Sequence, residues 1–378
     1  MKIEKYRPDL DQTKVISLKS ENGYKGNVLL SYVIEPFLLK EGESILNSHT
    51  HYGESLQIVE TWLNLGFYVD VISYRNKNFV PEKNYSYFVS ARTNFDRIAK
   101  LLNEDCIKIV HLDTAHWLFN NYSALKRCLD LQKRKNVTLK NNKIVRHNWS
   151  IEDADYATIL GNSFTIGTYT YAKKPIYQLP VPSVKLYPWA ENKNFQSCRN
   201  HFLWLGSGGV LHKGLDLALE AFAEMPDCHL TVCGPIHKEE DFERVYYKEL
   251  YETPNIDTLG WVDISSPEFT EITNNCIGLI YPSCAEGQAG AVVTCLQAGL
   301  IPIISYESGV DVNDFGVILK NCSIAEIKNS IRMIGNFSAE ELKQMARKAW
   351  SFARKNYTKE KYAEELNKIV KIILSDSQ

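Results

Sequence analysis

The sequence has no apolar run near the ~18 residues that a membrane-spanning helix needs, and its start (MKIEKYRPDLDQTK) lacks the apolar core of a signal peptide. Neither sign of charge is in excess, because 43 lysines and arginines are balanced by 45 aspartates and glutamates. The formal net charge of −2 gives no overall attraction to nucleic acid or anionic lipid. We therefore expect a cytoplasmic protein with no nucleic-acid partner.

Cysteine occurs nine times, an odd number, but never as a C-x-x-C pair or in a Cys/His cluster at zinc-binding spacing. Cys233, Cys276 and Cys295 stand in apolar stretches, which is typical of reduced core residues. We expect no bound metal. The motifs G-x-G-x-x-G and GK[ST] are also missing, so the sequence has neither a dinucleotide fingerprint nor a Walker A loop.

What the sequence does contain is two series of short apolar strands that alternate with helices over 378 residues, enough for two domains. Proline and polar residues between 180 and 200 mark a linker, so we place a domain boundary near residue 190. The pattern predicts an α/β protein with domains at 1–190 and 191–356 and a closing helix within 357–378.

The expected strands cover 27–34, 67–73, 85–89, 107–112, 156–160 and 176–179, then 201–205, 229–233, 256–259, 276–281, 301–305 and 317–319. The expected helices cover 54–65, 94–103, 215–223, 239–252, 268–274, 289–298 and 359–374, with two more that begin at Ser323 and Ser338. Residues 1–26 are polar and form either a leading edge strand or an arm.

The stretch 281–299, YPSCAEGQAGAVVTCLQAG, joins a buried strand to a helix of small apolar residues. Between them stands one carboxylate, Glu286, followed by Gly287 and Gly290. In a parallel sheet such a loop lies at the carboxyl edge, where ligands bind. The free N–H groups of a helix start favour phosphate, and a carboxylate accepts hydrogen bonds from hydroxyls, which together indicate a nucleotide-sugar. The alternative is that Glu286 merely favours the helix dipole.

A second candidate anion site is the turn GSGGVLHKG, residues 206–214, between an expected strand and an expected helix. Glycines let backbone N–H groups approach phosphate closely, and Lys213 adds a positive charge suited to a diphosphate. The residues offered by the turn itself are Gly206, Ser207, Gly208 and Gly209. The alternative is a tight strand-to-helix turn with a surface lysine.

The first half offers two groups of polar residues. The loop HTHYG, which contains His51 and Gly53, is a candidate acceptor-side lip, or else a solvent-exposed loop. The strand 107–112 runs into HLDTAHW, where His111 or His116 can hydrogen-bond a sugar hydroxyl or stabilise developing charge. The alternative there is helix capping by Asp113 or Thr114, with both histidines incidental.

The segment KRKNVTLKNNKIVR, residues 133–146, predicts a basic β-hairpin that turns at 141–142. Its charge suits an anionic acceptor or a membrane surface, so peripheral association with the inner face of a membrane stays open. A solvated hairpin with no partner is the competing interpretation.

Four pieces of the second half carry a resemblance to a known family: FLWLGSGGVLHKGLDLALEAF, LTVCGP, LGWV and YPSCAEGQAGAVVTCLQAGLIPIISYESG. They resemble the GT-B glycosyltransferases, specifically the retaining family-4 type, and NYTKEKYAEELNKI is similar to the family's closing helix. The resemblance covers 202–369 well, whereas the first half matches only in architecture. It implies two Rossmann-like domains that face each other across a cleft, with the last helix crossing back to the N-terminal domain.

By this resemblance, the chain moves a sugar from a UDP- or GDP-sugar to a saccharide or glycolipid acceptor in polysaccharide biosynthesis, with retention of anomeric configuration. We take neither of the two Asp-x-Asp pairs, at 9–11 and 153–155, as the mark of a metal-dependent transferase, so no metal or other cofactor is expected. The expected catalytic residues are Lys213, Glu286 and His116. The resemblance assigns the diphosphate to Lys213, the nucleobase to Gly234, Pro235, Trp261 and Val262, and the sugar hydroxyls to Glu286 with the amides of Gly287, Gln288, Ala289 and Gly290.

Two positions depart from the family pattern. Ser207 stands where an arginine is usual, six places before Lys213, and Thr294 stands where a second glutamate is usual, eight places after Glu286. Thr294 still offers a hydroxyl to a ribose, but without the strength of a charge-assisted hydrogen bond. Two alternatives therefore stay open: a non-catalytic partner that binds a nucleotide-sugar, and a nucleotide-sugar epimerase.

Overall fold

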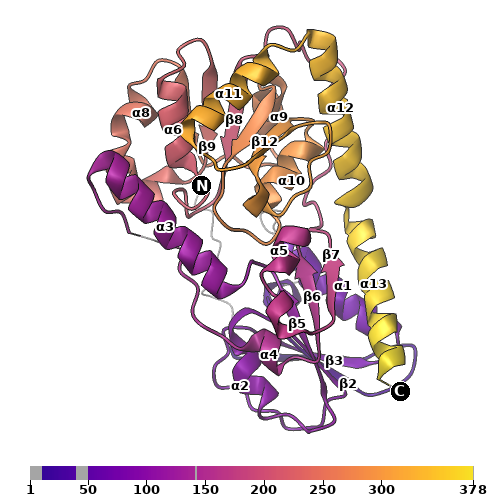
Figure 1. Ribbon diagram of the computed structural model, residues 1–378. Helices are drawn as coiled ribbons and strands as arrows, with labels where there is room; N and C mark the ends of the chain where they lie inside the picture. Colours follow the sequence, from indigo (N-terminus) through magenta and orange to yellow (C-terminus); the bar gives the residue numbers. More distant parts are fainter. Residues whose placement is uncertain (1–10, 40–49, 141–142, 378) are drawn as a thin grey trace.

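The computed structural model describes residues 11–39, 50–140 and 143–377, which form two α/β units, one above the other in Figure 1. The lower unit holds a seven-stranded sheet in the order β1-β3-β2-β4-β5-β6-β7. Its strands are parallel except β1, an edge strand antiparallel to β3. The strands are β1 (Val15–Leu18), β2 (Asn27–Tyr32), β3 (Tyr68–Ser73), β4 (Tyr87–Ala91), β5 (Ile107–Leu112), β6 (Tyr156–Leu160) and β7 (Ile176–Leu179).

The upper unit holds a six-stranded, fully parallel sheet in the order β10-β9-β8-β11-β12-β13. Its central strands read as continuous apolar runs because helices cover both faces of the sheet. The strands are β8 (His201–Leu205), β9 (His229–Cys233), β10 (Ile256–Gly260), β11 (Gly278–Tyr281), β12 (Ile301–Ser305) and β13 (Val317–Leu319). Two parallel α/β units confirm the predicted fold class, and residue 190, between β7 and β8, remains our proposed boundary.

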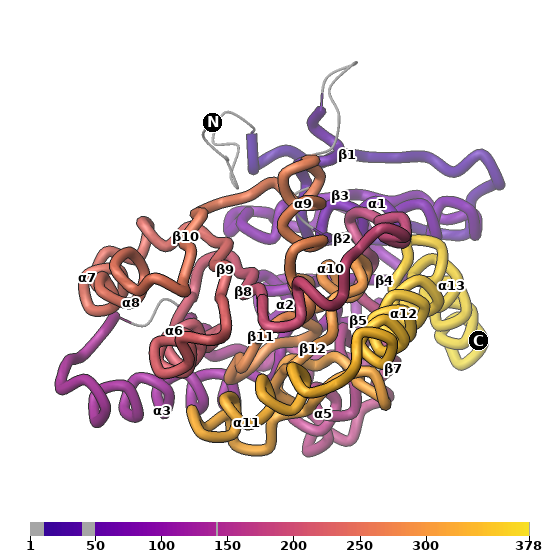
Figure 2. The backbone as a smooth tube through the Cα atoms, turned by 90° about the horizontal axis from the view of Figure 1, so that it is seen from above, coloured from indigo at the N-terminus to yellow at the C-terminus, as the bar shows by residue number. Residues whose placement is uncertain are grey.

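The helices pack on both faces of each sheet (Figures 1 and 2). In the first half they are α1 (Thr50–Asn64), α2 (Phe95–Ala99), α3 (Trp117–Lys135), α4 (Ser150–Asp153) and α5 (Ser163–Gly167). In the second half they are α6 (Leu215–Ala223), α7 (Glu240–Val245), α8 (Tyr247–Tyr251), α9 (Pro267–Asn275), α10 (Gly290–Gln297), α11 (Ile324–Gly335), α12 (Ala339–Asn356) and α13 (Lys359–Asp376). Within the described ranges, none of these helices combines the length and apolarity that crossing a lipid bilayer requires.

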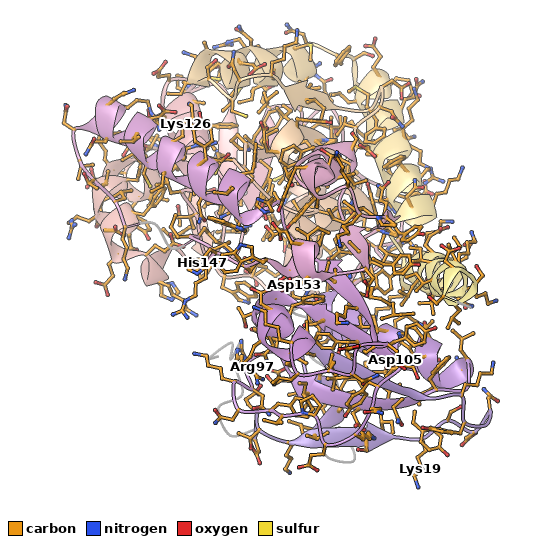
Figure 3. The ribbon with its side chains drawn as sticks, turned by 60° about the horizontal axis from the view of Figure 1, so that its bottom comes forward. Lys19, Arg97, Asp105, Lys126, His147 and Asp153 are labelled. Atoms are coloured by element: carbon orange, nitrogen blue, oxygen red, sulfur yellow. The ribbon has the colours of Figure 1, made fainter. Side chains whose placement is uncertain are left out.

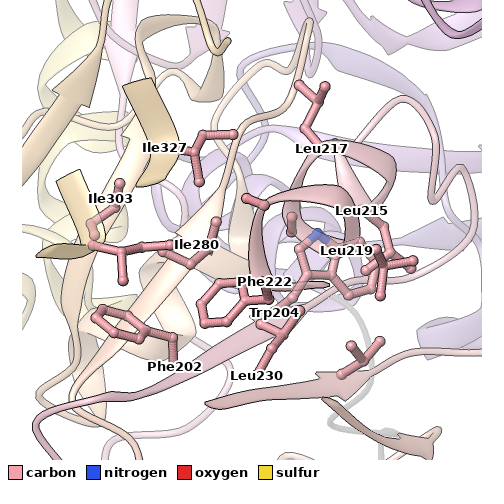
Figure 4. Close-up of a cluster of buried hydrophobic side chains, with 14 of the residues drawn as sticks. Phe202, Trp204, Leu215, Leu217, Leu219, Phe222, Leu230, Ile280, Ile303 and Ile327 are labelled. Atoms are coloured by element: carbon pink, nitrogen blue, oxygen red, sulfur yellow. The ribbon is translucent and has the colours of Figure 1, made fainter. Parts of the chain in front are cut away.

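The core of the upper unit is a set of fully buried side chains between the sheet and helices α6 and α11 (Figure 4). Trp204 of β8 and Phe222 of α6 are both 0% exposed. Burying one large apolar side chain stabilises the fold by roughly 1.5–3 kcal/mol. This core fixes α6 on the sheet, and with it the turn that precedes α6.

Helix α3 crosses from the lower unit to the upper one, as both Figure 1 and Figure 2 show. Its residue Leu131, and Leu139 beyond its end, are buried in the same core as Trp204 and Leu215. Helix α13 makes the reverse crossing and packs on α1 and β7 of the lower unit. Its apolar face (Tyr362, Leu366, Ile369, Val370 and Ile373) completes the lower core, as the resemblance implied.

Several expectations about local structure are wrong. Helix α1 begins at Thr50, so His51 and Gly53 lie in its first turns rather than in a loop; His49 lies outside the described residues. The expected basic hairpin does not form, because residues up to Lys135 belong to α3. Asn136, at φ 54° in the left-handed region, ends that helix, and the expected turn at 141–142 lies outside the described residues.

Two expected helices also differ from the observed ones. The helix expected over 94–103 covers only Phe95–Ala99, and the helix expected over 239–252 is divided into α7 and α8. The cap of α3 is His116, not Asp113 or Thr114, since the His116 ring accepts a hydrogen bond from the Leu118 amide. The helices expected to begin at Ser323 and Ser338 are confirmed as α11 and α12; each serine is the N-cap, and Ser338 forms a complete capping box with Glu341.

Candidate functional site

A cleft of about 2010 Å³ lies between the two units and is lined by residues of both. The carboxyl ends of the parallel strands of each sheet open into it, as expected for a ligand site in α/β proteins. Arg97 and His147, labelled in Figure 3, line it from the first half. Thirteen residues expected at the site from the sequence line it: His51, His111, Gly206, Ser207, Lys213, Gly234, Trp261, Val262, Glu286, Gly287, Gln288, Gly290 and Thr294.

Six other expected residues do not line the cleft: Gly53, His116, Gly208, Gly209, Pro235 and Ala289. Among the described residues, no cluster of three or more His, Cys, Asp or Glu side chains has the arrangement of a metal site.

Lys213 and Glu286 form an ion pair on the floor of the cleft, with 2.6 Å between Nζ and Oε1. The same Oε1 accepts hydrogen bonds from the Tyr281 hydroxyl and the Ser283 hydroxyl, each at 3.0 Å, and Lys213 also donates to Tyr281 at 2.9 Å. The sequence predicted Lys213 and Glu286 as parts of two separate candidate sites. The structure shows that they act on each other across 73 positions of chain.

The two loops that carry the pair are held together by backbone contacts. The amide of Cys284 donates to the His212 carbonyl at 2.9 Å. Gly214 has φ 75°, and a Cβ there would lie 2.6 Å from Cγ of Pro282, so only glycine lets the loops approach this closely. The turn before α6 and the loop before α10 are thus a single rigid unit.

Burial opposes the charged forms of both partners, yet each keeps its charge because of the other. Burial alone would raise the pKa of the Glu286 carboxyl. The positive charge of Lys213, helped by Lys143, instead brings that pKa down to about 2. Burial would likewise lower the pKa of Lys213, and the charge of Glu286 raises it well above the usual value. The cleft floor therefore offers a cation and a carboxylate side by side at neutral pH.

Two amides of the glycine turn, those of Gly206 and Gly209, already have partners within the chain. The buried carboxylate of Glu239 accepts hydrogen bonds from the amides of Gly209 and Val210. The amide of Gly206 donates to the Cys233 carbonyl at 2.9 Å. Two of the four donors that we had assigned to phosphate, the amides of Gly206 and Gly209, are thus satisfied by a carbonyl and a carboxylate of the chain itself. Nothing in the local sequence signalled this, since Glu239 lies 30 positions beyond the turn.

His212, next to Lys213, is buried and neutral. Its Nε2–H donates to the carbonyl of Ala285, so Nδ1 is left as the acceptor facing the Cys284 thiol at 3.4 Å. Burial lowers the pKa of His212 to about 4, and the charge of Glu286 only partly opposes that.

We expect this histidine to make the protein less stable in mild acid. Between the unfolded pKa of about 6.5 and the folded value, the unfolded chain binds a proton that the folded chain does not, so the free energy of unfolding should fall by about 2 kcal/mol from pH 7 to pH 5. Urea unfolding at both pH values would measure this. Because other histidines titrate too, the quantity to compare is the difference between the wild type and His212→Gln. An equal loss of stability in both proteins would mean that His212 is not the source.

The lower unit contributes a buried polar cluster at the ends of β4 and β5. Arg92 Nη2 lies 2.8 Å from Asp113 Oδ2 and 2.8 Å from His51 Nε2. Because a guanidinium only donates, His51 accepts with Nε2 and carries its proton on Nδ1, which lies 3.1 Å from Glu54 Oε2. His51, Arg92 and Asp113 all line the cleft. Neither Arg92 nor Glu54 was expected at the site from the sequence.

His111 belongs to the same cluster and His116 does not. His111 Nδ1 lies 2.8 Å from the Thr158 hydroxyl, and its Nε2 lies 3.5 Å from Oε2 of the fully buried Glu54. Burial alone would raise the pKa of the Glu54 carboxyl, but its interactions with His51 and His111 hold that pKa well below the usual range. His116 instead caps α3 and lies 3.0 Å from the Tyr171 hydroxyl. The structure therefore moves the candidate histidine from His116 to His111.

The remaining expected residues surround the pair. Gly234, Trp261 and Val262 line the end of the cleft near β9 and β10, and Thr294 lines it from the second turn of α10. Gly287 lies where the two units touch: its carbonyl accepts a hydrogen bond from the Thr165 hydroxyl at 2.7 Å, and a Cβ there would lie 2.7 Å from the carbonyl carbon of Asp113.

No family model matches the sequence, and no curated protein matches it. Solved structures do match. Sucrose-phosphate synthase from Thermosynechococcus elongatus is 12% identical with a TM-score of 0.63, over 93% of this chain and 99% of that one. HepE from Anabaena, solved with UDP and glucose, is 10% identical with a TM-score of 0.56, over 92% and 99%. WaaG, a glycosyltransferase of lipopolysaccharide biosynthesis, is 15% identical with a TM-score of 0.53, over 90% and 99%.

These neighbours are GT-B glycosyltransferases, and this chain has the GT-B fold. TarM from S. aureus also matches, at 11% identity and a TM-score of 0.54, but the match spans only 57% of TarM. At such identities the likeness establishes the fold alone. What the cleft does must be argued from the residues that line it.

Proposed function

We propose that the protein is a glycosyltransferase that moves a sugar from a nucleotide-sugar to a saccharide or glycolipid acceptor. The observation that carries this proposal is the buried Lys213–Glu286 pair on the floor of a cleft between two GT-B units. HepE, which shares the fold, was solved with UDP-glucose, and this favours a UDP-sugar as the first donor to try.

The side chains present suit the departure of a nucleoside diphosphate. As the bond from the sugar to the diphosphate breaks, negative charge grows on the phosphate and positive charge on the sugar. In this proposal Lys213 and the N-terminus of α10 stabilise the phosphate and Glu286 holds sugar hydroxyls, which is supported by the place of Lys213, Gly290 and Glu286 in the cleft lining. We propose retention of configuration and no metal, with the departing phosphate accepting the proton of the attacking hydroxyl.

His111 is the proposed contact of the lower unit with the donor sugar, since it lines the same cleft as the pair. Gly234, Trp261 and Val262 are proposed to border the nucleobase, and Thr294 to meet the ribose. A donor enclosed in the cleft between the two units would be shielded from water, which would limit its hydrolysis.

A non-catalytic partner that binds a nucleotide-sugar is the second candidate. The observation that favours it is the Glu239 carboxylate, which occupies amides that a diphosphate would otherwise use. The ion pair on the cleft floor argues against a non-catalytic partner, because a protein that only binds the donor does not need a lysine to stabilise a leaving group.

The experiment is a panel of UDP-, GDP- and ADP-sugars, in which nucleotide release and thermal stabilisation are both recorded. Release from one donor supports the transferase and names its base and sugar. Stabilisation without release supports the partner. If no donor is turned over and none shifts the melting temperature, both candidates are wrong and the cleft binds something else.

A further inference from the structure

An arginine with a strained backbone lies in the cleft wall, directly after β4. Arg92 has φ 69°, in the left-handed region that residues other than glycine rarely adopt. Such strain persists where the surrounding structure holds it, and it gathers at ligand sites. The Thr93 hydroxyl donates to the Tyr74 carbonyl at 3.0 Å. The side-chain amide of Asn94 donates to the Asn76 carbonyl at 2.8 Å. These two contacts fix the backbone from which the Arg92 side chain extends.

The guanidinium of Arg92 pairs with Asp113 through only one atom of each group. Its Nη2 lies 2.8 Å from Asp113 Oδ2 and 2.8 Å from His51 Nε2. Its carbon lies 5.3 Å from the centre of the Tyr74 ring, in a cation–π contact. An arginine and a carboxylate often form two parallel hydrogen bonds instead. Here Nη1 of Arg92 and Oδ1 of Asp113 form no hydrogen bond or ion pair with any residue that the structure describes.

These two remaining atoms are open to the cleft. The side chains of Arg92 and Asp113 are 32% and 12% exposed, and both residues line the cleft together with Tyr74. The buried side-chain atoms without a partner include Nε of Arg92 but neither Nη1 nor Oδ1. The pair therefore presents one hydrogen-bond donor and one acceptor to whatever occupies this part of the cleft.

Asp113 also lies where the lower unit touches the loop that carries Glu286. A Cβ on Gly287, the residue after Glu286, would lie 2.7 Å from the carbonyl carbon of Asp113. A molecule held by the Arg92–Asp113 pair would thus lie next to the sugar that Glu286 is proposed to hold.

The chemistry of the pair suits hydroxyls rather than phosphate. The charges of Arg92 and Asp113 balance, so together they give a diphosphate little net attraction. Burial would raise the pKa of the Asp113 carboxyl, but the positive charge of Arg92 brings that pKa below its usual value, so Oδ1 belongs to an ionised carboxylate at neutral pH. A hydroxyl both donates and accepts hydrogen bonds. Two neighbouring hydroxyls of a saccharide can therefore donate to Oδ1 and accept from Nη1.

We propose that the Arg92–Asp113 pair is the acceptor site, where two neighbouring hydroxyls of a saccharide bind. This rests on the proposed function and gives the chemical class of the acceptor. The ionised carboxylate orients a hydroxyl of the acceptor through a hydrogen bond, while the leaving phosphate remains the group that takes the proton.

The test uses the full-length protein, the nucleotide-sugar selected by the donor panel, and the methyl glycosides of glucose, galactose and mannose as acceptors. Transfer is measured as nucleotide release above the rate without acceptor. Asp113→Asn removes a charge-assisted hydrogen bond, so the KM for the glycoside that is used should rise by about 10-fold or more. Arg92→Lys keeps the charge but loses the planar set of N–H groups, and it should raise the same KM by about 10-fold. The affinity of both variants for UDP, measured by titration calorimetry, should stay within about threefold of the wild type.

Asp70→Asn is the matched control. Asp70 is likewise a buried carboxylate of the lower unit, paired with Lys83 at 2.9 Å, but it does not line the cleft. Its variant should keep the acceptor KM of the wild type. Monodeoxy forms of the glycoside give a second measurement. Removing the hydroxyl that Asp113 binds should raise the KM of the wild type by about 10-fold and change that of Asp113→Asn little further, because the two changes remove the same contact.

An unchanged acceptor KM in Asp113→Asn overturns the proposal, and so does an equal rise in Asp70→Asn, which would indicate a general distortion. Additive effects of Asp113→Asn and every monodeoxy glycoside overturn it as well. If a donor is turned over but no methyl glycoside accelerates the release, the acceptor site is wrong while the proposed function stands. If no donor is turned over, the proposed function fails and the acceptor site fails with it.

Discussion

Replacing Lys213 with alanine is expected to reduce nucleotide release from the donor by about 10²–10³-fold, the usual effect of removing one group that stabilises charge in a transition state. The lysine is the cation of the buried pair on the cleft floor, 2.6 Å from Glu286. The same change leaves a buried carboxylate without its partner, which costs about 3–5 kcal/mol of stability. Release assayed at saturating donor, with a urea unfolding curve of each variant, measures both effects.

The two effects can be separated with a double variant. Lys213→Met with Glu286→Gln removes both charges and keeps similar volumes, so we expect most of the stability to return while turnover stays lost. Glu286→Gln alone should retain folding better than Lys213→Ala, because it leaves an amide that still accepts from Tyr281 and Ser283. Turnover that recovered with stability in the double variant would show that the pair is only structural.

The second large effect is expected at Asp216, on the first turn of α6, which is 0% exposed. Each of its oxygens meets an arginine of α3: Arg134 at 2.5 Å and Arg127 at 3.4 Å. Arg127 also donates to the Pro282 carbonyl at 2.8 Å. Asp216→Ala leaves two cations facing each other at the junction of the two units, so we expect a loss of about 3–5 kcal/mol in the free energy of unfolding.

Asp130→Ala is the control for that measurement. Asp130 lies on α3, the helix that carries the two arginines, but it pairs with Lys126 in solvent. Exposed pairs contribute about 1 kcal/mol or less, so this variant should unfold close to the wild type. Urea unfolding followed by tryptophan fluorescence compares the two. Similar curves for Asp216→Ala and Asp130→Ala would contradict a buried role for the network.

The sequence predicted the strands of the second half closely because most of them are apolar runs that end at a proline, a glycine or a polar turn. The bounds of β8, β9, β12 and β13 and of helix α6 match the expectation to the residue. The same local signals identified Lys213 and Glu286 as candidate site residues in the two strand-to-helix loops. In these regions the local pattern and the tertiary packing favour the same structure.

The failures occurred where contacts between distant segments decide the structure. The basic segment was predicted to form a hairpin that turns at 141–142, but Arg134 belongs to α3 and pairs with Asp216 and Glu220 of α6, 82 and 86 positions away. Glu239 reaches the glycine turn from the next loop of the sheet. No local pattern carries either contact, and Arg92, with φ 69° at the end of β4, belongs to no turn motif that the sequence announces.

The reciprocal crossing of α3 and α13 has a consequence for how the chain folds as it is synthesised. Leu131 leaves the ribosome more than 80 residues before Leu215 and Phe222, the side chains it packs among. The core of the lower unit is completed later still, because the face of α13 that completes it is synthesised last. Domains usually fold in order from the N-terminus, each on its own segment. Here neither unit can finish its core until nearly the whole chain has emerged, so the apolar face of α3 stays uncovered at least until the strands and helices of the upper unit have been synthesised.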